Sequence, residues 1–216
     1  MATERVALVA GASGGIGQAV ARRLGREGHH LYLGYRSRRE ATEELAAELR
    51  DQGSKADALF VDVTDSSGVA AVCRNIHEIR GRLEILVNCA AVNREAPALG
   101  MEDAAWEEVL RTNLTGAFFL CREAAKYMLL GRWGRIVNVS SISGRFGGRG
   151  QANYAASKAG LEGLTRVLAA EVGRKGVLVN AVAPGIIETE LSRRVREELA
   201  PPLLEAISLR RFGRPE

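Results

Sequence analysis

The sequence contains few residues that form disulfides or bind metals: three cysteines and three histidines among 216 residues. Because the cysteines are odd in number and far apart, at Cys73, Cys89 and Cys121, we predict that no disulfide forms. The histidines lack the spacing of metal ligands, and the adjacent His29 and His30 before an apolar run are typical of a loop. We therefore predict no metal site.

Long apolar runs are also missing. No stretch of about 18 consecutive apolar residues occurs, and residues 1–10 do not place a basic stretch before a long apolar segment. We therefore predict a cytoplasmic protein that does not associate with membranes.

Charge of one sign is not concentrated anywhere in the chain. The 30 Lys and Arg residues are interleaved with 26 Asp and Glu residues, which gives a net charge of +4. Because no basic stripe forms, we predict no nucleic-acid binding. The small positive excess fits an anionic ligand or partner as well as an ordinary solvated surface.

Short apolar runs alternate with longer helical patterns along the chain. The runs lack clean apolar and polar alternation, which indicates strands buried on both faces, over residues 5–11, 30–35, 58–63, 84–90, 135–141 and 177–185. Helices are expected over residues 16–27, 38–52, 67–80, 103–130 and 151–173. Such alternation predicts βαβ units. We therefore predict one α/β domain over residues 1–216, a Rossmann-type doubly wound parallel sheet with helices on both faces.

A glycine-rich segment joins the first predicted strand to the first predicted helix. Residues 11–17, GASGGIG, place glycines at positions 11, 14, 15 and 17. Glycine lets the backbone turn sharply, and the free amides and dipole of a helix N-terminus favour a pyrophosphate. The segment lacks the Lys-Ser or Lys-Thr pair of a phosphate-loop nucleoside triphosphatase, and it departs from the G-x-G-x-x-G spacing. We expect an anion-binding turn, with a merely structural turn as the alternative.

The second predicted strand ends in LGYRSRRE, which is basic where many NAD sites are acidic. An acid at this place binds the ribose 2′-hydroxyl of NAD, whereas an arginine accommodates the 2′-phosphate of NADP. Here Arg36 and Ser37 follow Tyr35, and the first acid is Glu40. We therefore predict NADP(H) as the cofactor. The alternative is that Arg36, Arg38 and Arg39 belong to the solvated start of a helix.

Tyr154 and Lys158 lie four positions apart in QANYAASKAG, at the start of a predicted helix. Side chains at this spacing face the same way, and the preceding predicted strand ends in Ser140 and Ser141 at the sheet edge where ligands bind. A hydroxyl, a phenol and an ammonium are thus expected to converge on one oxygen. A free phenol has a pKa of about 10, and we expect Lys158 to lower the pKa of Tyr154 toward the range that suits proton transfer.

Together these motifs resemble those of the short-chain dehydrogenase/reductase family over essentially the whole chain. The glycine turn has the family's spacing, Ser141 stands where the family has its catalytic serine, and Asn113 in RTNLTG matches the asparagine that supports a proton-relay water. The resemblance implies four catalytic residues: Asn113, Ser141, Tyr154 and Lys158. Tyr154 would protonate a carbonyl oxygen that Ser141 also binds, during hydride transfer to the carbonyl carbon. Lys158 would hold the nicotinamide ribose, and Asn113 would link Lys158 to solvent.

The same resemblance implies the cofactor contacts. Asp62 in VDVTD matches the acid that contacts the adenine ring, and the segment around Pro184 matches the part that contacts the nicotinamide. The implied cofactor residues are Gly11, Ser13, Gly15, Ile16, Gly17, Arg36, Ser37, Asp62, Val63, Asn88, Tyr154, Lys158, Pro184, Gly185 and Thr189.

Within the family, GQANYAASKAGLEGLTRVLAAEV and GRWGRIVNVSSISG most resemble the 3-oxoacyl-(acyl-carrier-protein) reductases of fatty-acid and polyketide synthesis. The resemblance implies NADPH-dependent reduction of a carrier-bound 3-oxoacyl thioester. In that subgroup, basic residues near the cleft dock the acidic acyl carrier protein, and Arg132 and Lys175 hold the matching positions here. The alternative is that both are ordinary surface charges.

Two other functions remain open. An NADP-dependent alcohol or sugar dehydrogenase of the same family shares the catalytic set, so the substrate is less certain than the reaction. A non-catalytic dinucleotide-binding regulator would be expected to lose Tyr154 or Lys158, and this chain keeps both.

The sequence departs from the family's pattern in two places. Cys89 and Ala91 stand in NCAA where the family has asparagine and glycine. Family members also continue past RRFGRPE with a helix and a last strand, so the sequence is either truncated or lacks that edge strand. Because that part usually joins subunits, the homotetramer is less secure, and we expect a homo-oligomer, either tetramer or dimer. Residues 188–210, broken by Pro201-Pro202, are expected to form a substrate lid of two short helices that order on binding.

Overall fold

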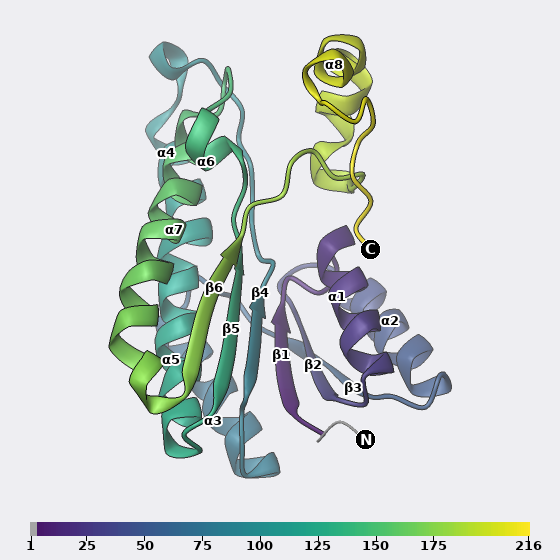
Figure 1. Cartoon of the computed structure of the whole chain (residues 1–216), viewed down its shortest axis with the longest axis vertical. Coiled ribbons are helices and arrows are strands. Elements are labelled where there is room, and N and C mark those ends of the chain that lie inside the picture. Colours follow the sequence, from purple (N-terminus) through teal and green to yellow (C-terminus); the bar gives the residue numbers. More distant parts are fainter. Residues whose placement is uncertain (1–3) are drawn as a thin grey trace.

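The computed structural model describes residues 4–216 and shows a six-stranded sheet between two layers of helices (Figure 1). The strand order is β3-β2-β1-β4-β5-β6, and every neighbouring pair is parallel. The strands are β1 (Val6–Ala10), β2 (His30–Tyr35), β3 (Lys55–Phe60), β4 (Ile85–Asn88), β5 (Gly134–Val139) and β6 (Val177–Val182). The predicted doubly wound α/β sheet is confirmed.

Helices cover the two faces of the sheet unequally. On one side, α1 (Gly15–Arg26) and α2 (Arg39–Asp51) pack near β1, β2 and β3; on the other, α3 (Ser66–Arg80), α5 (Gly116–Leu130) and α7 (Ala152–Val172) form a layer (Figure 1). The shorter segments are η1 (Ala98–Gly100), α4 (Asp103–Leu110), η2 (Arg111–Thr115), α6 (Ser143–Phe146), η3 (Gly173–Lys175), η4 (Glu190–Ser192) and α8 (Arg193–Ala206). Within residues 4–216, none of these helices has the length and apolar character that crossing a membrane requires.

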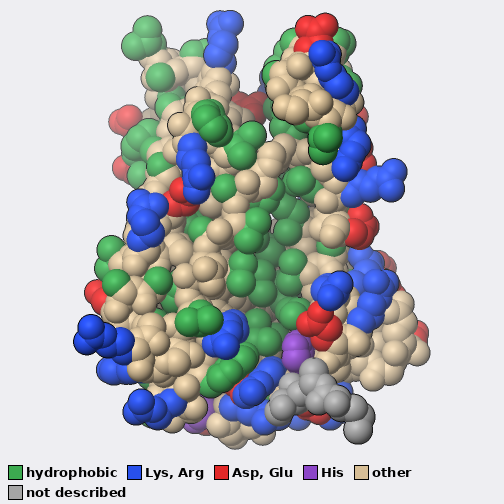
Figure 2. Space-filling view, in the orientation of Figure 1, with side chains coloured by type: hydrophobic (Ala, Val, Ile, Leu, Met, Phe, Trp, Pro, Cys, Tyr) green, Lys and Arg blue, Asp and Glu red, His purple; other side chains and the backbone are tan. Residues whose placement is uncertain are grey.

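The predicted burial on both faces holds for β1, β2 and β4 and fails at β3, β5 and β6. Every residue of β1 is buried, whereas Leu178 and Val182 on β6 are 46% and 53% exposed. Figure 1 shows no helix of the described residues in front of β5 and β6, and Figure 2 shows hydrophobic side chains gathered over the middle of this face. Because β6 is the last strand of the sheet in residues 4–216, its apolar run is covered on one face only.

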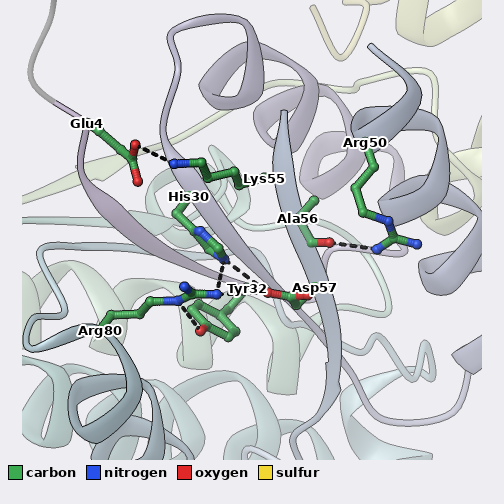
Figure 3. Close-up of polar contacts among 8 residues, drawn as sticks. All are labelled: Glu4, His30, Tyr32, Arg50, Lys55, Ala56, Asp57 and Arg80. Carbon is green, nitrogen blue, oxygen red and sulfur yellow. Dashed lines mark hydrogen bonds and ion pairs between the residues drawn. The ribbon is translucent and has the colours of Figure 1, made fainter. Parts of the chain in front are cut away.

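A polar cluster ties β2 and β3 to the end of α3 (Figure 3). Nε2 of His30 lies 3.0 Å from Oδ2 of Asp57, and Nε of Arg80 donates to the hydroxyl of Tyr32 at 2.9 Å. His30 therefore begins a strand and is buried, so its interpretation as a loop residue is wrong. β3 begins at Lys55 rather than at residue 58, because its pairing with β2 starts opposite His30.

The long predicted helix over residues 103–130 is present, with one interruption. It consists of α4, the π-helical turn η2 and α5 without a break in the chain's helical course. π-Helical turns inside longer helices occur frequently at functional sites. The sequence does not reveal this turn, because it adds one residue to a helical repeat without a glycine or proline to mark it.

The segment expected to form a lid is helical and kinked. Helix α8 spans residues 193–206, with Leu199 outside helical geometry at φ −126° and ψ 17°. The kink falls two residues before Pro201, because the two consecutive prolines provide no N–H for the carbonyls of the preceding turn. The expected pair of short helices is therefore present, as two helical pieces on either side of the kink at Leu199.

Candidate active site

A cavity of about 580 Å³ opens at the carboxyl ends of the parallel strands. It lies where the strand order reverses, because β1 pairs with β2 on one side and with β4 on the other. Its walls come from the segments that follow β1, β2, β3, β4, β5 and β6, and from the start of α7. Doubly wound sheets bind their ligands at this position.

The turn after β1 requires glycine at two positions. Gly11 has a φ of +74°, and a Cβ there would lie 2.7 Å from the backbone nitrogen of Ala90. A Cβ on Gly17, in the first turn of α1, would lie 2.3 Å from the carbonyl oxygen of Gly11. The first turn of α1 contains no acidic residue. Its free amides and the positive end of its dipole therefore fit a pyrophosphate at the cavity.

We expect Gly17→Ala to weaken both folding and cofactor binding. The added methyl group would overlap the backbone of the turn, so the free energy of unfolding should fall by about 3 kcal/mol or more. Urea unfolding and a fluorescence titration with NADPH measure the two effects. Gly173→Ala is the matched control, because Gly173 has helical geometry and no atom lies within 4 Å of the added carbon. A Gly17→Ala protein as stable as the wild type would contradict this close approach.

The chain after β2 brings basic residues to the same cavity. Tyr35, Arg36, Ser37 and Arg38 all line it. The two arginine side chains are exposed and form no ion pair with any residue of the described chain. Arg39, by contrast, pairs with Glu43 at 2.7 Å and does not line the cavity. The geometry thus offers two free guanidinium groups where a ribose 2′-phosphate would lie.

Tyr154 and Lys158 lie on the first turns of α7, and Ser141 follows β5; all three line the cavity. The Nζ atom of Lys158 donates to the Val139 carbonyl oxygen at 2.7 Å and lies 5.5 Å from the centre of the Tyr154 ring. The Oγ atom of Ser141 accepts from the Ser143 amide at 3.1 Å. Because that bond uses a lone pair of the serine oxygen, the hydroxyl proton remains available to a group in the cavity.

The pKa of Tyr154 differs from the prediction. Burial raises it above the ordinary value of 10.0, and a hydrogen bond with Ser141 opposes part of the rise. The predicted lowering by Lys158 is wrong: burial lowers the pKa of Lys158 itself to about 8, and its Nζ is bonded to a backbone carbonyl. Tyr154 therefore keeps its proton at neutral pH, which is the form that donates to a carbonyl oxygen.

Asn113 does not line the cavity but holds one of its walls. It is completely buried in the π-helical turn η2. Its Oδ1 accepts from the Val92 amide at 2.8 Å, and its Nδ2 donates to the Val92 carbonyl at 2.9 Å and to Ser157 Oγ at 3.1 Å. This side chain fixes the loop after β4, and the predicted link from Lys158 to solvent stays a prediction.

Asp62 and Asn88 do not line the cavity, and each side chain hydrogen-bonds within the turn that follows its strand. The Oδ1 atom of Asp62 accepts from the amide and the hydroxyl of Thr64 at 2.9 and 2.8 Å, which closes a tight turn after β3. The Oδ1 atom of Asn88 accepts from the Ala90 amide at 3.2 Å, and Asn88 is buried. Neither residue is part of the cavity lining, and their predicted contacts with the cofactor stay predictions.

The segment after β6 closes the cavity opposite the glycine turn. A Cβ on Gly15 would lie 2.7 Å from Cγ2 of Thr189, so the two segments nearly touch. Thr189 and Ser192 form a capping box at the start of η4, in the segment that was expected to form a lid. The predicted cofactor residues that line the cavity are Gly11, Ser13, Gly15, Ile16, Gly17, Arg36, Ser37, Val63, Tyr154, Lys158, Pro184, Gly185 and Thr189.

Arg132 and Lys175 lie at the opposite edge of the sheet. Arg132 precedes β5 and Lys175 precedes β6, and the Gly134 amide donates to the Gly176 carbonyl to join these two starting points. The cavity opens at the other ends of these strands, which are six residues each and hence span about 20 Å. The prediction that both residues lie near the chain's own cleft is therefore wrong.

Sequence reasoning missed a polar part of the wall beside Tyr154. Asn93 and Gln151 both donate to Oε1 of Glu95, at 3.0 and 3.3 Å, and all three line the cavity. Gln151 lies three residues before Tyr154, which is the one sequence signal that pointed here.

Cys89, one of the departures from the family's pattern, is also part of the wall. It lines the cavity, and burial raises the pKa of its thiol to about 12. Cys89 therefore contributes a small apolar side chain rather than a reactive thiolate. Cys73 and Cys121 are buried, and all three cysteines are free.

The fold and the cavity define a dinucleotide-binding α/β oxidoreductase. A family model described as short chain dehydrogenase matches residues 5–200. The 3-oxoacyl-(acyl-carrier-protein) reductase FabG of Pseudomonas aeruginosa is 42% identical over 212 residues, which cover 98% of this chain and 85% of that protein. The chain belongs to the short-chain dehydrogenase family, as its motifs predicted.

Two solved structures show how closely the fold is shared. One is described as an NAD(P)-dependent gluconate 5-dehydrogenase from Beutenbergia cavernae with bound NADP; the TM-score is 0.93 and the identity 38%, over 98% of this chain and 85% of that one. The other is a variant of actinorhodin polyketide ketoreductase with NADPH; the TM-score is 0.92 and the identity 35%, over 100% of this chain and 88% of that one.

Proposed function

We propose that the protein uses NADPH to reduce the 3-oxo group of a 3-oxoacyl thioester carried by acyl carrier protein. The observation that carries the proposal is the convergence of Ser141, Tyr154 and Lys158 on the cavity that the glycine turn and Arg36 also line. The similarity to the reductase FabG and to a polyketide ketoreductase supports the class of substrate.

The residues of the cavity fit the cofactor from end to end. Residues 11–17 offer free amides to the pyrophosphate, and Arg36 and Ser37 offer donors to the 2′-phosphate. Val63 forms an apolar wall for the adenine, and residues 184–189 close over the nicotinamide end. NADPH, when bound, supplies the hydride.

The protein's own residues handle the oxygen of the substrate carbonyl. Tyr154 donates its proton to that oxygen as negative charge develops there. The hydroxyl of Ser141 donates a second hydrogen bond to the same oxygen, at the place where charge increases in the transition state. Lys158, held by the Val139 carbonyl, lies beside the phenol and binds the nicotinamide ribose.

Oxidation of NADPH in the presence of acetoacetyl-CoA tests this function. The near-ultraviolet absorbance of the reduced nicotinamide should fall with NADPH and much more slowly with NADH. Loss of absorbance only with ketoses or other free ketones would overturn the substrate class, and no loss with any carbonyl compound would overturn the reaction.

We expect Arg36→Ala to reduce the preference for NADPH. Loss of one charge-assisted bond to the 2′-phosphate should raise the KM for NADPH by about tenfold to a hundredfold and leave the KM for NADH nearly unchanged. Arg39→Ala is the matched control, because Arg39 lies three residues further along the chain and pairs with Glu43 instead. Equal effects of Arg36→Ala on both cofactors would contradict a 2′-phosphate contact.

A second candidate function is the NADP(H)-dependent reduction of a ketose, or of another free ketone, to the corresponding alcohol. The gluconate 5-dehydrogenase structure favours it, and so does the polar wall of Asn93, Glu95 and Gln151, which can hydrogen-bond hydroxyl groups. Comparison of kcat/KM for acetoacetyl-CoA and for 5-ketogluconate separates the two functions.

We also propose that the protein is cytoplasmic and forms a homo-oligomer, either a dimer or a tetramer. In a symmetric assembly, Arg132 and Lys175 of one copy can lie beside the cleft of a partner copy and attract the acidic acyl carrier protein there. The uncovered apolar face of β5 and β6 supports association of some kind. Sedimentation velocity tests this, and a monomer at the concentrations used for the assay would overturn it.

A further inference from the structure

Ser140 directly precedes Ser141, and its side chain contacts helix α7. Its Oγ lies 3.2 Å from the carbonyl oxygen of Lys158 and 3.3 Å from Oε1 of Glu162. Ser140 is 3% exposed, so these partners are its contacts in place of water. The residue that follows β5 is thereby held against helix α7.

The backbone around Ser140 is hydrogen-bonded to the end of β6 and the segment after it. The Ser140 amide donates to the Val182 carbonyl at 2.7 Å, and the Ile142 amide donates to the Pro184 carbonyl at 3.1 Å. Ser140 and Ser141 both line the cavity, so the contacts that hold Ser140 against α7 also fix where the next residue, Ser141, can lie.

Glu162 is the charged member of this arrangement. It lies one helical turn after Lys158 and is 8% exposed. Its Oε2 accepts from Nε of Arg145 at 3.1 Å, and its Oε1 lies near the Ser140 hydroxyl. Burial of a carboxylate destabilises the folded state unless both oxygens are hydrogen-bonded. We therefore expect each oxygen of Glu162 to keep its partner in place.

The short helix α6 is pressed onto α7 at the same level. A Cβ on Gly144 would lie 2.8 Å from the Ala159 nitrogen and 3.0 Å from the carbonyl carbon of Lys158. The Gly144 amide also donates to the carbonyl oxygen of Ser141 at 3.0 Å. A shift of α6 would therefore move Ser141 directly.

We infer that Glu162 is a positioning residue, which holds Ser140 on one side and Arg145 on the other and so sets the direction of the Ser141 hydroxyl toward the substrate oxygen. The inference rests on the proposed function, because it requires Ser141 to act on that oxygen. Glu162 touches neither the cavity nor the reacting groups; it acts through Ser141.

Glu162→Gln tests this with little change in volume. Glutamine is uncharged and presents an NH2 donor in place of one carboxylate oxygen, so the charge-assisted bond to Arg145 and the acceptor for Ser140 are not both kept, and the arrangement is weakened. We expect kcat with acetoacetyl-CoA to fall about tenfold, while the Kd for NADPH stays nearly unchanged. Ser140→Ala, which removes only the hydroxyl, should lower kcat in the same way but less.

A double-mutant cycle with Ser141→Ala separates positioning from general damage. Ser141→Ala alone should lower kcat by about 10²- to 10³-fold. In that background Glu162→Gln should change kcat by less than about twofold, because no hydroxyl remains to be directed. A merely structural role would give the same tenfold loss in both backgrounds.

Glu123→Gln is the matched control. Glu123 is also buried and accepts bonds on both oxygens, from Arg122 and Lys126, but it lies on α5 and does not line the cavity. Its replacement should lower the melting temperature about as much as Glu162→Gln does and leave kcat unchanged.

The outcomes separate the two levels of the account. If Ser141→Ala lowers kcat as expected and Glu162→Gln acts equally in both backgrounds, or has no effect on kcat, the positioning role is overturned and the proposed function stands. If Ser141→Ala itself leaves kcat unchanged, the catalytic role of Ser141 is overturned together with the positioning role. If Glu162→Gln does not fold, Ser140→Ala in the same cycle decides.

Discussion

Tyr154→Phe should lower kcat for 3-oxoacyl reduction by about 10²- to 10⁴-fold. The phenol is the proton donor for the carbonyl oxygen, and phenylalanine keeps the ring but removes that proton. NADPH affinity should change little, since most of the cavity that surrounds the cofactor is formed by other segments. Steady-state kinetics with acetoacetyl-CoA and a fluorescence titration with NADPH measure the two quantities.

The pH dependence gives a second test of the same group. Burial raises the pKa of Tyr154 above 10.0, so its protonated form persists throughout the neutral range. The rate of reduction by the wild type should therefore not fall across neutral pH through loss of the Tyr154 proton. A Tyr154→Phe enzyme with near wild-type turnover and normal NADPH binding would contradict its assignment as the proton donor.

Lys158→Met should remove most of the turnover and also change how stability depends on pH. Burial lowers the pKa of Lys158 from 10.5 to about 8. Between these values the unfolded chain binds a proton at this lysine that the folded chain does not, so wild-type stability rises with pH across this window. Across this window the titration of Lys158 raises the free energy of unfolding by about 3 kcal/mol, and the Lys158→Met protein lacks this increase.

Urea unfolding at a series of pH values between 7 and 10.5 measures the effect. The free energy of unfolding of the wild type, minus that of Lys158→Met, should increase by about 3 kcal/mol from pH 8 to pH 10.5. Lys55→Met, which replaces an exposed lysine on β3, serves as the control and should follow the wild type. Parallel curves for wild type and Lys158→Met would show that Lys158 is not buried as a destabilised cation.

The order of the elements could be predicted because burial leaves a clear pattern in a doubly wound sheet. Strands such as β1 are covered on both faces and so consist of continuous apolar runs, which differ from the helical patterns between them. The same logic failed at the edges. Because Lys55 and Asp57 are polar, the beginning of β3 did not stand out as part of an apolar run. The apolar run of β6 did not indicate that one face of this strand is exposed.

The candidate site was predictable where a residue's type alone carries the chemistry. Gly11, Tyr154 and Lys158 follow strand ends at fixed spacing, and the topology brings those ends to one cavity. The direction of a pKa shift was not predictable, because it depends on how deeply Tyr154 is buried and on which atom the Lys158 ammonium faces.

Residues that act through other residues were the hardest to foresee. Asn113 reaches Val92 from a π-helical turn, and Glu162 reaches Ser140 and Arg145 from the next turn of α7. Such contacts join elements that are far apart in the sequence, and no spacing within one element indicates them. They emerge only from the packing of α6 and α7 against the ends of the strands.

The most direct test of the central claim is to follow the transferred hydrogen. The protein is given NADPH that carries deuterium at C4 of the nicotinamide, together with a 3-oxoacyl group on acyl carrier protein, and the product is examined by mass spectrometry. The account predicts a 3-hydroxyacyl product with deuterium at C3, formed by the wild type and nearly absent with Tyr154→Phe. An unchanged 3-oxoacyl group, with the same enzyme active on a ketose, would contradict it.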